Sequence, residues 1–372
     1  MQVRDCAVDY MKHALSLAEL ALGYTSPNPA VGAVIVKEGK VVGVGFTQSP
    51  GSAHAEVMAL RQAKDRARDA AMYVALEPCC HQGRTPPCTQ AIIDAGISEI
   101  HIALIDPNPL VSGKGIKLLK EAGINVQVGE HEEDARRLNE SYIKFITTGM
   151  PFVITKFAMS LDGKIATKEG DSKWISSYES RNYVHRLRHT VDAIMVGANT
   201  VIVDDPQLTA RRCSSKGGKT RVQPLRIVID GKGRTPASAR VFREPGKTLV
   251  VAAKPLNARK AKSLEKAGAE IVELPAKEDI IDLTGLLKLL GKRQVTSILA
   301  EGGSGLLGSL FDNCLVDKAF VYISPIIIGG EKAKNAVGGD GVGKVSDAVH
   351  LDNVRTEYSG NDIVICGYLH KK

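Results

Sequence analysis

The stretch at residues 76–88, LEPCCHQGRTPPC, decides the interpretation of this chain, because it sets three cysteines, a histidine and an arginine among turn-forming residues. The chain has seven cysteines in 372 residues, and its N-terminus lacks the unbroken apolar run of a signal peptide. We therefore expect a cytoplasmic protein, in which clustered thiols are more often metal ligands or catalytic groups than disulfides. The stretch predicts a functional site.

A second motif, HAE at residues 54–56, precedes the cysteines. Zinc deaminases combine H-x-E at the start of one helix with P-C and a further cysteine at the start of another. His54, Cys79 and Cys88 would supply one nitrogen and two thiolates, and would leave the fourth tetrahedral position to a water. Zinc lowers the pKa of such a water to about 7. Glu56 is placed to take the water's proton and to pass it to the departing amine, so we expect hydrolytic deamination with Glu56 as the catalytic group.

The spacing of the thiols leaves alternatives open. Eight residues separate Cys79 from Cys88, whereas the commonest deaminase pattern has two between its cysteines. We choose Cys79 over Cys80 because a proline precedes Cys79, and we expect Cys80 to point elsewhere. In the alternative interpretation the thiols form a structural zinc site with His81 as fourth ligand, and such a site has no use for Glu56.

Strands and helices alternate in the first part of the chain, which favours a largely parallel sheet covered on both faces. Residues 31–46, VGAVIVKEGKVVGVGF, are two β-branched runs around a turn and predict a hairpin. The expected helices are residues 10–23, 54–64, 87–95, 115–122 and 132–146, and the further strands are residues 72–76, 99–105 and 125–128.

The segment TTGMP at residues 147–151 interrupts this rhythm with a glycine and a proline, and a new strand follows it. We place a domain boundary there, which gives domains of residues 1–148 and 149–372, both α/β. In the second domain we expect strands at residues 152–159, 193–196, 225–229, 248–252, 270–274 and 297–300, and two late apolar β runs at residues 319–328 and 362–369.

The net charge of +8 is unevenly shared between these parts. Residues 1–148 carry 15 Lys and Arg against 17 Asp and Glu, a net charge of −2, and the remainder carries +10. A basic second half suits a phosphate-bearing ligand, although a solvated surface or a zinc-stabilised nucleic-acid-binding protein would share this charge. Glu56 argues against nucleic-acid binding, because binding alone gives that carboxylate no task. No apolar run approaches the roughly 18 residues of a membrane span.

Four motifs of the first part, SPNPAVGAVIV, HAEVMAL, LEPCCHQGRTPPC and IALIDPNPLVSGKGIKLLKEAGI, resemble the N-terminal half of the bifunctional riboflavin-biosynthesis deaminase/reductase. Four of the second part, TKFAMSLDGKIA, GDSKWIS, MVGANTVIVDDPQLTAR and AEGGSGLLGSL, resemble its reductase half. The long spacing between Cys79 and Cys88 is typical of this family. The resemblance implies a cytidine-deaminase-like three-layer α/β/α domain followed by a dihydrofolate-reductase-like α/β domain.

The same resemblance implies two consecutive reactions in riboflavin biosynthesis. A zinc-bound hydroxide would deaminate 2,5-diamino-6-(5-phosphoribosylamino)pyrimidin-4(3H)-one, and NADPH would then reduce the ribosyl chain to give 5-amino-6-(5-phosphoribitylamino)uracil. The cofactors would be Zn²⁺ and NADPH, the only partner a small molecule, and the assembly a homo-oligomer, either a dimer or a tetramer. A competing hypothesis keeps the deaminase but makes the second half a non-catalytic domain that holds substrate or dimerises.

Particular residues match the family's contacts. In the first domain Asn28 would touch the pyrimidine edge, and His81 and Arg84 would lie near the substrate phosphate. The residues implied for the nicotinamide cofactor are Ala158, Trp174, Thr200, Asp204, Gly303, Ser304, Gly305, Leu306, Leu307, Gly308 and Ser309. Those implied for the substrate of the reductase are Ser172, Arg188, Leu208, Arg211 and Glu301.

These assignments have a physical basis and plainer alternatives. Two arginines can clamp a phosphate, and the only tryptophan can supply a flat apolar wall, but Trp174 can equally be a core anchor and the arginines solvated charges. The segment EGGSG follows a predicted strand and opens a helix, so its free N–H groups can receive a phosphate. Such a turn is often only a tight connection, and it lacks the dinucleotide fingerprint of a Rossmann domain. Lys156 and Asp204 are polar groups at strand ends, and the sequence assigns neither as an acid or base.

Overall fold

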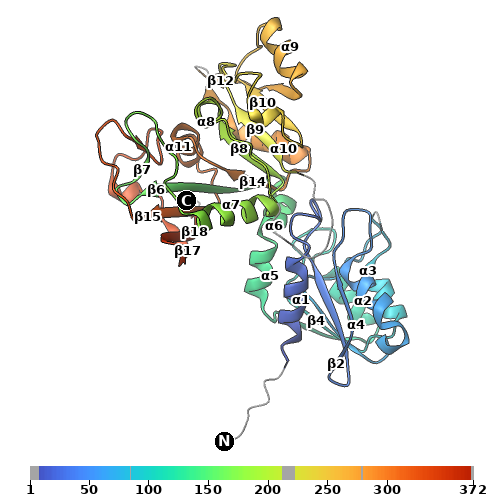
Figure 1. Ribbon diagram of the computed structural model, residues 1–372. Helices are drawn as coiled ribbons and strands as arrows, with labels where there is room; N and C mark the ends of the chain where they lie inside the picture. The colour runs from blue at the N-terminus through green and yellow to red at the C-terminus, as the bar shows by residue number, and fades with distance from the viewer. Residues whose placement is uncertain (1–7, 84, 212–222, 278–279, 370–372) are drawn as a thin grey trace, which may run out of the picture. The chain divides into compact units, whose positions relative to one another are not determined.

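The computed structural model describes residues 8–83, 85–211, 223–277 and 280–369 (Figure 1). Contacts within the chain divide it into two units, Met1–Gly149 and Met150–Lys372, one residue beyond the boundary that the TTGMP segment predicts. The two units are described separately below. Among the described residues, no helix combines the length and the apolar character that a membrane crossing requires.

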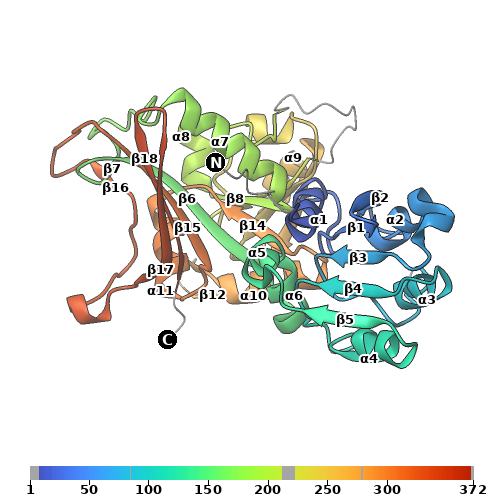
Figure 2. The ribbon, with the colours of Figure 1, turned by 90° about the horizontal axis from the view of Figure 1, so that it is seen from below.

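The first unit contains a five-stranded sheet in the order β2-β1-β3-β4-β5. The hairpin strands β1 and β2 pair antiparallel, β1 also pairs antiparallel with β3, and β3, β4 and β5 are parallel. Helices α1, α5 and α6 lie on one face of this sheet and α2, α3 and α4 on the other, which makes three layers (Figure 2). The strands are β1 (Gly32–Lys37), β2 (Lys40–Phe46), β3 (Ala71–Val74), β4 (Glu99–Ile102) and β5 (Asn125–Val128). The helices are α1 (Tyr10–Glu19), α2 (Ala55–Ala63), α3 (Cys88–Asp94), α4 (Lys114–Glu121), α5 (Glu132–Leu138) and α6 (Glu140–Thr148), with a 3₁₀ turn at Lys64–Ala67.

Glycines of the hairpin allow two helices to lie directly on the sheet. A Cβ at Gly32 would collide with the carbonyl of Ala14 in α1, and one at Gly45 would collide with the carbonyl of Ala55 in α2. A Cβ at Gly43 would likewise collide with the carbonyl of Ala59 in the same helix. The hairpin therefore fixes the position of α2, the helix that begins directly after His54.

The sequence predicts one long helix over residues 132–146, and this prediction is wrong. The helix breaks at Asn139, whose backbone has φ −106° and ψ 17°. The side chain of Asn139 is buried and bonds both backbone groups of Ala30: Oδ1 accepts from the Ala30 N–H at 2.9 Å, and Nδ2 donates to the Ala30 carbonyl at 3.0 Å. A residue 109 positions away thus ends the helix, and helical periodicity does not reveal such a contact.

The second unit contains a nine-stranded sheet in the order β11-β10-β9-β8-β14-β6-β15-β18-β17. The seven strands from β11 to β15 are parallel, and β18 and β17 extend the sheet with antiparallel pairing. The strands are β6 (Phe152–Ser160), β8 (Ala193–Gly197), β9 (Leu225–Ile229), β10 (Thr248–Ala252), β11 (Ala269–Glu273), β14 (Ser297–Ala300), β15 (Lys318–Ser324), β17 (Leu351–Ser359) and β18 (Asp362–Leu369). Short strands are β7 (Lys164–Ala166), β12 (Ala276–Lys277), β13 (Ile280–Ile281) and β16 (Lys334–Asn335). The helices are α7 (Tyr178–Thr190), α8 (Ala198–Asp204), α9 (Ala258–Lys266), α10 (Leu283–Lys292) and α11 (Ser304–Asp312), with 3₁₀ turns at Arg240–Phe242 and Val345–Asp347.

Each face of this sheet has its own hydrophobic core, because successive strand residues point to opposite faces. In β14, Leu299 joins a cluster with α7, α8 and α9, whereas Ile298 and Ala300 join a cluster with α10 and α11. Parallel strands covered on both faces end together at one edge, and the helices begin there. The carboxyl ends of β6, β8, β9 and β14 form that edge, and the cavity described below lies along it.

Candidate active sites

Three predicted zinc ligands of the first unit lie together. His54 is the residue before α2, Cys79 follows β3, and Cys88 is the first residue of α3. The Nδ1 atom of His54 is 3.6 Å from Cys79 Sγ and 3.3 Å from Cys88 Sγ, and the possible ligand atoms of all three lie within 4.8 Å of one another. One imidazole and two thiols form a donor set that suits Zn²⁺ with one open tetrahedral position.

The orientation of His54 is set by Thr85, a residue that the sequence reasoning missed. Thr85 Oγ1 lies 3.2 Å from His54 Nε2, so that the ring turns Nδ1 toward the two sulfurs. A hydrogen bond at the far nitrogen is the usual way to hold a histidine ligand in the right tautomer and direction. The signal was available, since Thr85 is the only hydroxyl between the two cysteines.

The two thiols do not have the same acidity. Hydrogen bonding by Cys88 lowers the pKa of the Cys79 thiol to about 4, with His54 contributing in the same direction. The same contact raises the pKa of Cys88, because its thiol proton is held in the hydrogen bond to the Cys79 thiolate. The backbone N–H of Cys88 also donates to Cys79 Sγ at 3.4 Å, as expected for a thiolate near a helix N-terminus.

Glu56 lies in the first turn of α2 and is 4 % exposed. Burial raises the pKa of this carboxyl to about 7, and the negative charge of Cys79 acts in the same direction. A carboxyl of such acidity can both accept and release a proton at neutral pH. The arrangement therefore joins a metal-ligand set to a proton carrier, and a purely structural metal site needs no such group.

The other residues predicted for this site have mixed outcomes. Cys80 points away from the cluster and its Sγ donates to the carbonyl of Leu110 at 3.8 Å. His81 is outside the ligand cluster, so it is not a fourth ligand, and its buried Nδ1 has no hydrogen-bond partner among the described residues. Asn28 lies in the loop before β1, where its N–H donates to the carbonyl of Thr25. Arg84 lies outside the described residues.

The peptide that carries Cys79 is anchored by Glu77, which the sequence reasoning also missed. Glu77 is 3 % exposed, and its carboxylate accepts from the backbone N–H groups of Asp106 at 3.2 Å, Gly113 at 2.9 Å and Ile116 at 3.1 Å. A Cβ at Gly115 would collide with the carbonyl of Pro78. The first turn of α4 therefore packs directly against the two residues before the thiol.

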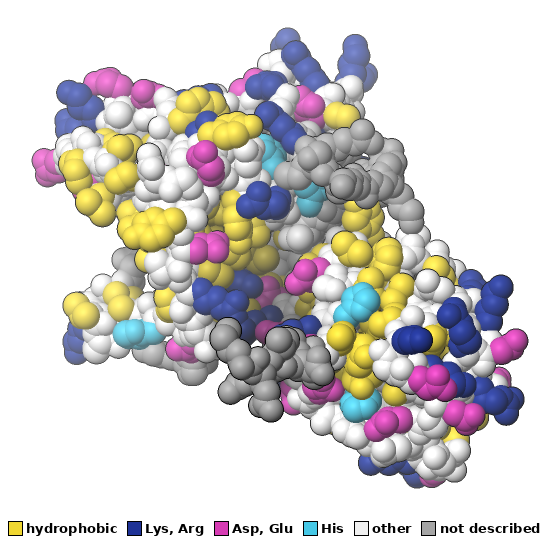
Figure 3. All heavy atoms as spheres, turned by 60° about the horizontal axis from the view of Figure 1, so that its bottom comes forward, with side chains coloured by type: hydrophobic (Ala, Val, Ile, Leu, Met, Phe, Trp, Pro, Cys, Tyr) yellow, Lys and Arg dark blue, Asp and Glu magenta, His cyan; other side chains and the backbone are white. Residues whose placement is uncertain are grey.

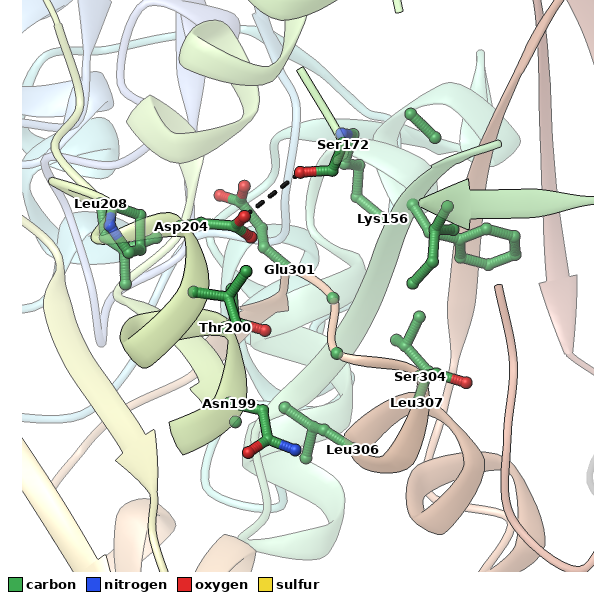
Figure 4. A pocket seen from close by; sticks show the side chains of 18 of the residues that line it. Lys156, Ser172, Asn199, Thr200, Asp204, Leu208, Glu301, Ser304, Leu306 and Leu307 are labelled. Atoms are coloured by element: carbon green, nitrogen blue, oxygen red, sulfur yellow. Dashed lines mark hydrogen bonds between the residues drawn. The ribbon is translucent and has the colours of Figure 1, made fainter. Parts of the chain in front are cut away.

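The second unit has a cavity of about 1170 Å³ at the carboxyl edge of its sheet. Figure 4 shows side chains from β6, from α8 and from the turn between β14 and α11 converging around it. Its volume exceeds what one small ligand needs, and it suits a cofactor and a substrate side by side. Every residue predicted for this unit's ligands lines the cavity except Gly308; the lining members are Ala158, Ser172, Trp174, Arg188, Thr200, Asp204, Leu208, Arg211, Glu301, Gly303, Ser304, Gly305, Leu306, Leu307 and Ser309.

The glycine-rich turn forms one wall of this cavity. Gly302 and Gly303 have φ of 76° and 81°, a conformation that residues with a side chain rarely adopt. α11 begins directly afterwards at Ser304, so its first N–H groups are free to meet an anion. Gly308 has another role, because a Cβ there would collide with the backbone of Gly338 and Gly339.

Predicted cofactor and substrate contacts pair with one another across this cavity. The hydroxyl of Ser172 donates to Asp204 Oδ1 at 3.2 Å, which ties the segment before α7 to the end of α8 (Figure 4). Trp174 is 69 % exposed, so it is not the core anchor of the plainer interpretation. The guanidinium of Arg181 lies 4.4 Å from the centre of its ring, which holds the indole at the rim of the cavity.

A largely buried ion pair lines the cavity. Both oxygens of Glu301 accept from Arg188, with Nε–Oε1 at 2.5 Å and Nη2–Oε2 at 2.7 Å. Lys156 of β6 also lines the cavity, and burial lowers the pKa of its ammonium group. Arg211, the second predicted phosphate ligand, donates to Gln207 Oε1 at 2.7 Å and is exposed.

On the described residues visible in Figure 3, basic side chains do not form a single stripe. On the face in Figure 3, Lys and Arg side chains are interspersed with Asp, Glu and apolar groups. Nucleic-acid-binding surfaces usually collect their basic residues on one face, so this distribution gives the nucleic-acid hypothesis no support.

Comparison with known proteins identifies the family of both units. The family model of the cytidine and deoxycytidylate deaminase zinc-binding region matches residues 4–104, and that of the RibD C-terminal domain matches residues 151–365. Riboflavin biosynthesis protein RibD of Aquifex aeolicus is 44 % identical over 98 % of both chains, and that of Escherichia coli is 38 % identical over 96 % of this chain and 97 % of its own.

Solved structures give the same result. The chain superposes on Acinetobacter baumannii RibD with a TM-score of 0.86 and 36 % identity. It superposes on a diaminohydroxyphosphoribosylaminopyrimidine deaminase/5-amino-6-(5-phosphoribosylamino)uracil reductase of Thermotoga maritima with a TM-score of 0.82 and 34 % identity. Each alignment covers 97 % of this chain and 98 % of the other. These likenesses confirm the predicted fold class, and the chain belongs to the RibD family of bifunctional riboflavin-biosynthesis enzymes, in which a zinc-binding deaminase domain is joined to a reductase domain.

Proposed function

We propose that the first unit hydrolyses the 2-amino group of 2,5-diamino-6-(5-phosphoribosylamino)pyrimidin-4(3H)-one, and that the second reduces the product with NADPH to 5-amino-6-(5-phosphoribitylamino)uracil. The observation that carries this proposal is the cluster of His54, Cys79 and Cys88 beside the buried Glu56. The Thermotoga maritima relative is named for the same two steps.

In the first step the chain's residues hold the metal and move one proton. His54, Cys79 and Cys88 would hold Zn²⁺, which supplies a Lewis acid that makes water a nucleophile at neutral pH. Glu56 takes a proton from the attacking water and gives it to the departing amine, so that the C–N bond breaks and ammonia leaves. The second hydrogen of the water ends on a ring nitrogen as the new C–O bond becomes a carbonyl. The pKa of Glu56, raised to about 7, suits a group that must both accept and donate.

In the second step the chain aligns two ligands, because the hydride belongs to the cofactor. The turn at Gly302 and Gly303 and the start of α11 would hold the cofactor's phosphates. The hydride goes to C1′ of the sugar as the bond from C1′ to the ring oxygen breaks, and that oxygen takes up a proton. Lys156, which lines the cavity, is available to supply that proton.

Incubation of the purified full-length protein with the diaminopyrimidine substrate and NADPH tests both steps. Ammonia release reports on the first unit, and loss of reduced-nicotinamide absorbance reports on the second. We expect both signals, with cofactor oxidation following ammonia release. Release of ammonia without NADPH oxidation would reject the reductase and favour a domain that only holds substrate, and the absence of ammonia would reject the deaminase.

A further inference from the structure

Among the described residues, Lys156 is a cation of the reductase cavity without a polar partner. It extends from β6, lines the cavity and is half-buried (Figure 4). Its Nζ atom makes no hydrogen bond and no ion pair with any described residue. The carboxylate of Glu301 lines the same cavity, but both of its oxygens already accept from Arg188. A partly desolvated ammonium group in this position needs another source of stabilisation.

The ring of Tyr322 supplies a direct contact to this ammonium group. The Nζ atom of Lys156 lies over the ring, 5.3 Å from its centre, which is within the roughly 6 Å over which an aromatic face attracts a cation. Strand β15 pairs parallel with β6, and the register sets Tyr322 opposite Ala158. Residues two apart on a strand share a face, so Lys156 points to the same face as Ala158 and Tyr322. The pairing of the two strands therefore brings the amine and the ring together.

Tyr322 has little freedom to move. It is 0 % exposed, and its strand has a neighbour on each side, β6 and β18. The ring of Tyr183 in α7 meets it edge-on, with the two centres 6.2 Å apart. The Tyr322 hydroxyl has no hydrogen-bond partner in the part of the chain that the structure describes. The fixed ring, and not the hydroxyl, is thus what Tyr322 presents to Lys156.

The charges around Lys156 give the ring contact its importance. Burial lowers the pKa of the ammonium group, and the positive charge of Arg188 acts in the same direction. The carboxylates of Glu301 and Asp362 oppose this effect. The face of an aromatic ring is negative and favours the charged form of an amine above it, so Tyr322 acts together with the two carboxylates.

We propose that the ring of Tyr322 holds the ammonium group of Lys156 in the reductase cavity by a cation–π contact, which makes Tyr322 a positioning residue for the reduction. This inference rests on the proposed reductase function, in which Lys156 supplies the proton for the sugar oxygen. The contact fixes the place of the proton donor, and it favours the protonated amine that is able to donate.

The acidity of Lys156 can be measured without any turnover. Trace labelling of the full-length protein with acetic anhydride at a series of pH values, followed by mass spectrometry of the peptide that contains Lys156, gives the pKa of this amine. In Tyr322→Leu we expect the pKa to fall by about 0.5–1.5, because a desolvated cation–π contact is lost. Tyr322→Phe keeps a ring, and its pKa should stay within about 0.3 of the wild-type value.

Tyr368→Leu is the matched control for this measurement. It removes a tyrosine ring that lies 4.8 Å from the amine of another lysine, Lys318, and leaves the ring beneath Lys156 in place. We expect the pKa of Lys156 to be unchanged in this variant. A pKa that stays the same or rises in Tyr322→Leu overturns the proposal, and so does an equal fall in Tyr322→Leu and Tyr368→Leu.

A graded change of the ring tests the same contact if the leucine variant does not fold. Phenylalanine analogues with one, two or three ring fluorines can be introduced at position 322 by nonsense suppression. They nearly keep the shape of the side chain but withdraw electron density from the face of the ring. We expect the pKa of Lys156 to fall with each added fluorine, and a constant pKa along this series overturns the proposal.

Steady-state kinetics connect the contact to the reaction. Because the donor must be protonated, kcat for NADPH oxidation should be lost as the pH rises through the pKa of Lys156, and Tyr322→Leu should move this alkaline limb to lower pH. Its kcat at neutral pH should fall roughly threefold to thirtyfold, whereas Tyr322→Phe and Tyr368→Leu should stay within about twofold of the wild type. A lower kcat with an unmoved alkaline limb would show a general packing defect and overturn the positioning role. If the wild type oxidises no NADPH, the proposed reductase fails, and the labelling still decides whether Tyr322 holds Lys156.

Discussion

Glu301 and Arg188 form a bidentate ion pair that lines the reductase cavity, with both contacts at 2.7 Å or less. The family resemblance implies that both residues contact the substrate, and the structure shows that each is also the partner of the other. Arg188 Nη1 also donates to the carbonyl of Thr209 at 3.2 Å, so its guanidinium is held from two sides. The pair therefore has a structural role in addition to any contact with a ligand.

The two predicted phosphate arginines should consequently respond differently to removal. Arg188→Ala leaves the buried Glu301 without its partner and should lower the stability of the second unit by about 3–5 kcal/mol. Arg211→Ala should leave stability within about 0.5 kcal/mol, because Arg211 is exposed. Both should raise KM for the phosphoribosyl substrate more than KM for NADPH. Urea denaturation and steady-state kinetics measure the two effects, and equal stability of the two variants would contradict the structural role of the pair.

Replacement of Glu56 separates proton transfer from metal binding. Glu56→Gln keeps the volume of the side chain but cannot carry a proton, so ammonia release should fall by about 10²–10⁴-fold. Zinc content by metal analysis should stay at the wild-type level, because Glu56 is outside the ligand set. Loss of zinc from this variant would make Glu56 a ligand and would reject its assignment as the proton carrier.

Adjacent thiols allow a matched test of the metal site. Cys88→Ser should reduce zinc affinity and, with it, the stability of the first unit, because metal binding contributes free energy to folding. Cys80→Ser should retain both, since Cys80 Sγ faces the carbonyl of Leu110. Competition with a colorimetric chelator measures the affinity, and thermal denaturation measures the stability. If Cys80→Ser loses zinc and Cys88→Ser keeps it, the ligand set proposed here is wrong.

A buried carboxyl should make the stability of the first unit depend on pH. Burial raises the pKa of Asp106 to about 6, above the ordinary value near 3.9, although Tyr142 donates to it at 3.0 Å. The folded state therefore favours the protonated form, and this stabilisation is present below about pH 4 and is lost as the pH rises through 6.

Asp106→Asn stays neutral at every pH and should be more stable than the wild type at pH 8, by at most about 3 kcal/mol. The difference should shrink toward pH 4, where the wild-type carboxyl is also neutral. Urea denaturation at several pH values measures it, and Asp65→Asn, which removes an exposed carboxylate, controls for the change in net charge. A difference that does not change with pH would show that burial of the charge is not the cause.

Local pattern predicted much of the fold. Residues 225–229, 248–252 and 297–300 are β strands with the bounds that their β-branched runs indicate, and the hairpin at 31–46 forms around the expected turn. Long-range contacts explain the differences. Asn139 breaks a helix because it bonds Ala30, and β17 was missed because its residues are mostly exposed and carry no apolar alternation.

The site shows the same division between local and long-range information. Motifs predicted the cluster of His54, Cys79 and Cys88, because His54 directly precedes α2, Cys88 begins α3 and a proline precedes Cys79. Glu77 leaves no such signature, because it acts through backbone partners 29 to 39 residues away that only the fold brings near. The Arg188–Glu301 pair is likewise invisible in the sequence, since 113 residues separate its members.

Glu77 links the metal-ligand loop to a helix with no chemistry of its own. Its three backbone contacts reach the loop at Asp106 and the first turn of α4, and Gly115 of that turn has no room for a side chain beside Pro78. A substitution in the first turn of α4 would therefore weaken metal binding, although this turn contains none of the predicted metal ligands. An assay that measures only the enzymatic rate of α4 variants would not distinguish reduced metal affinity from a slower catalytic step.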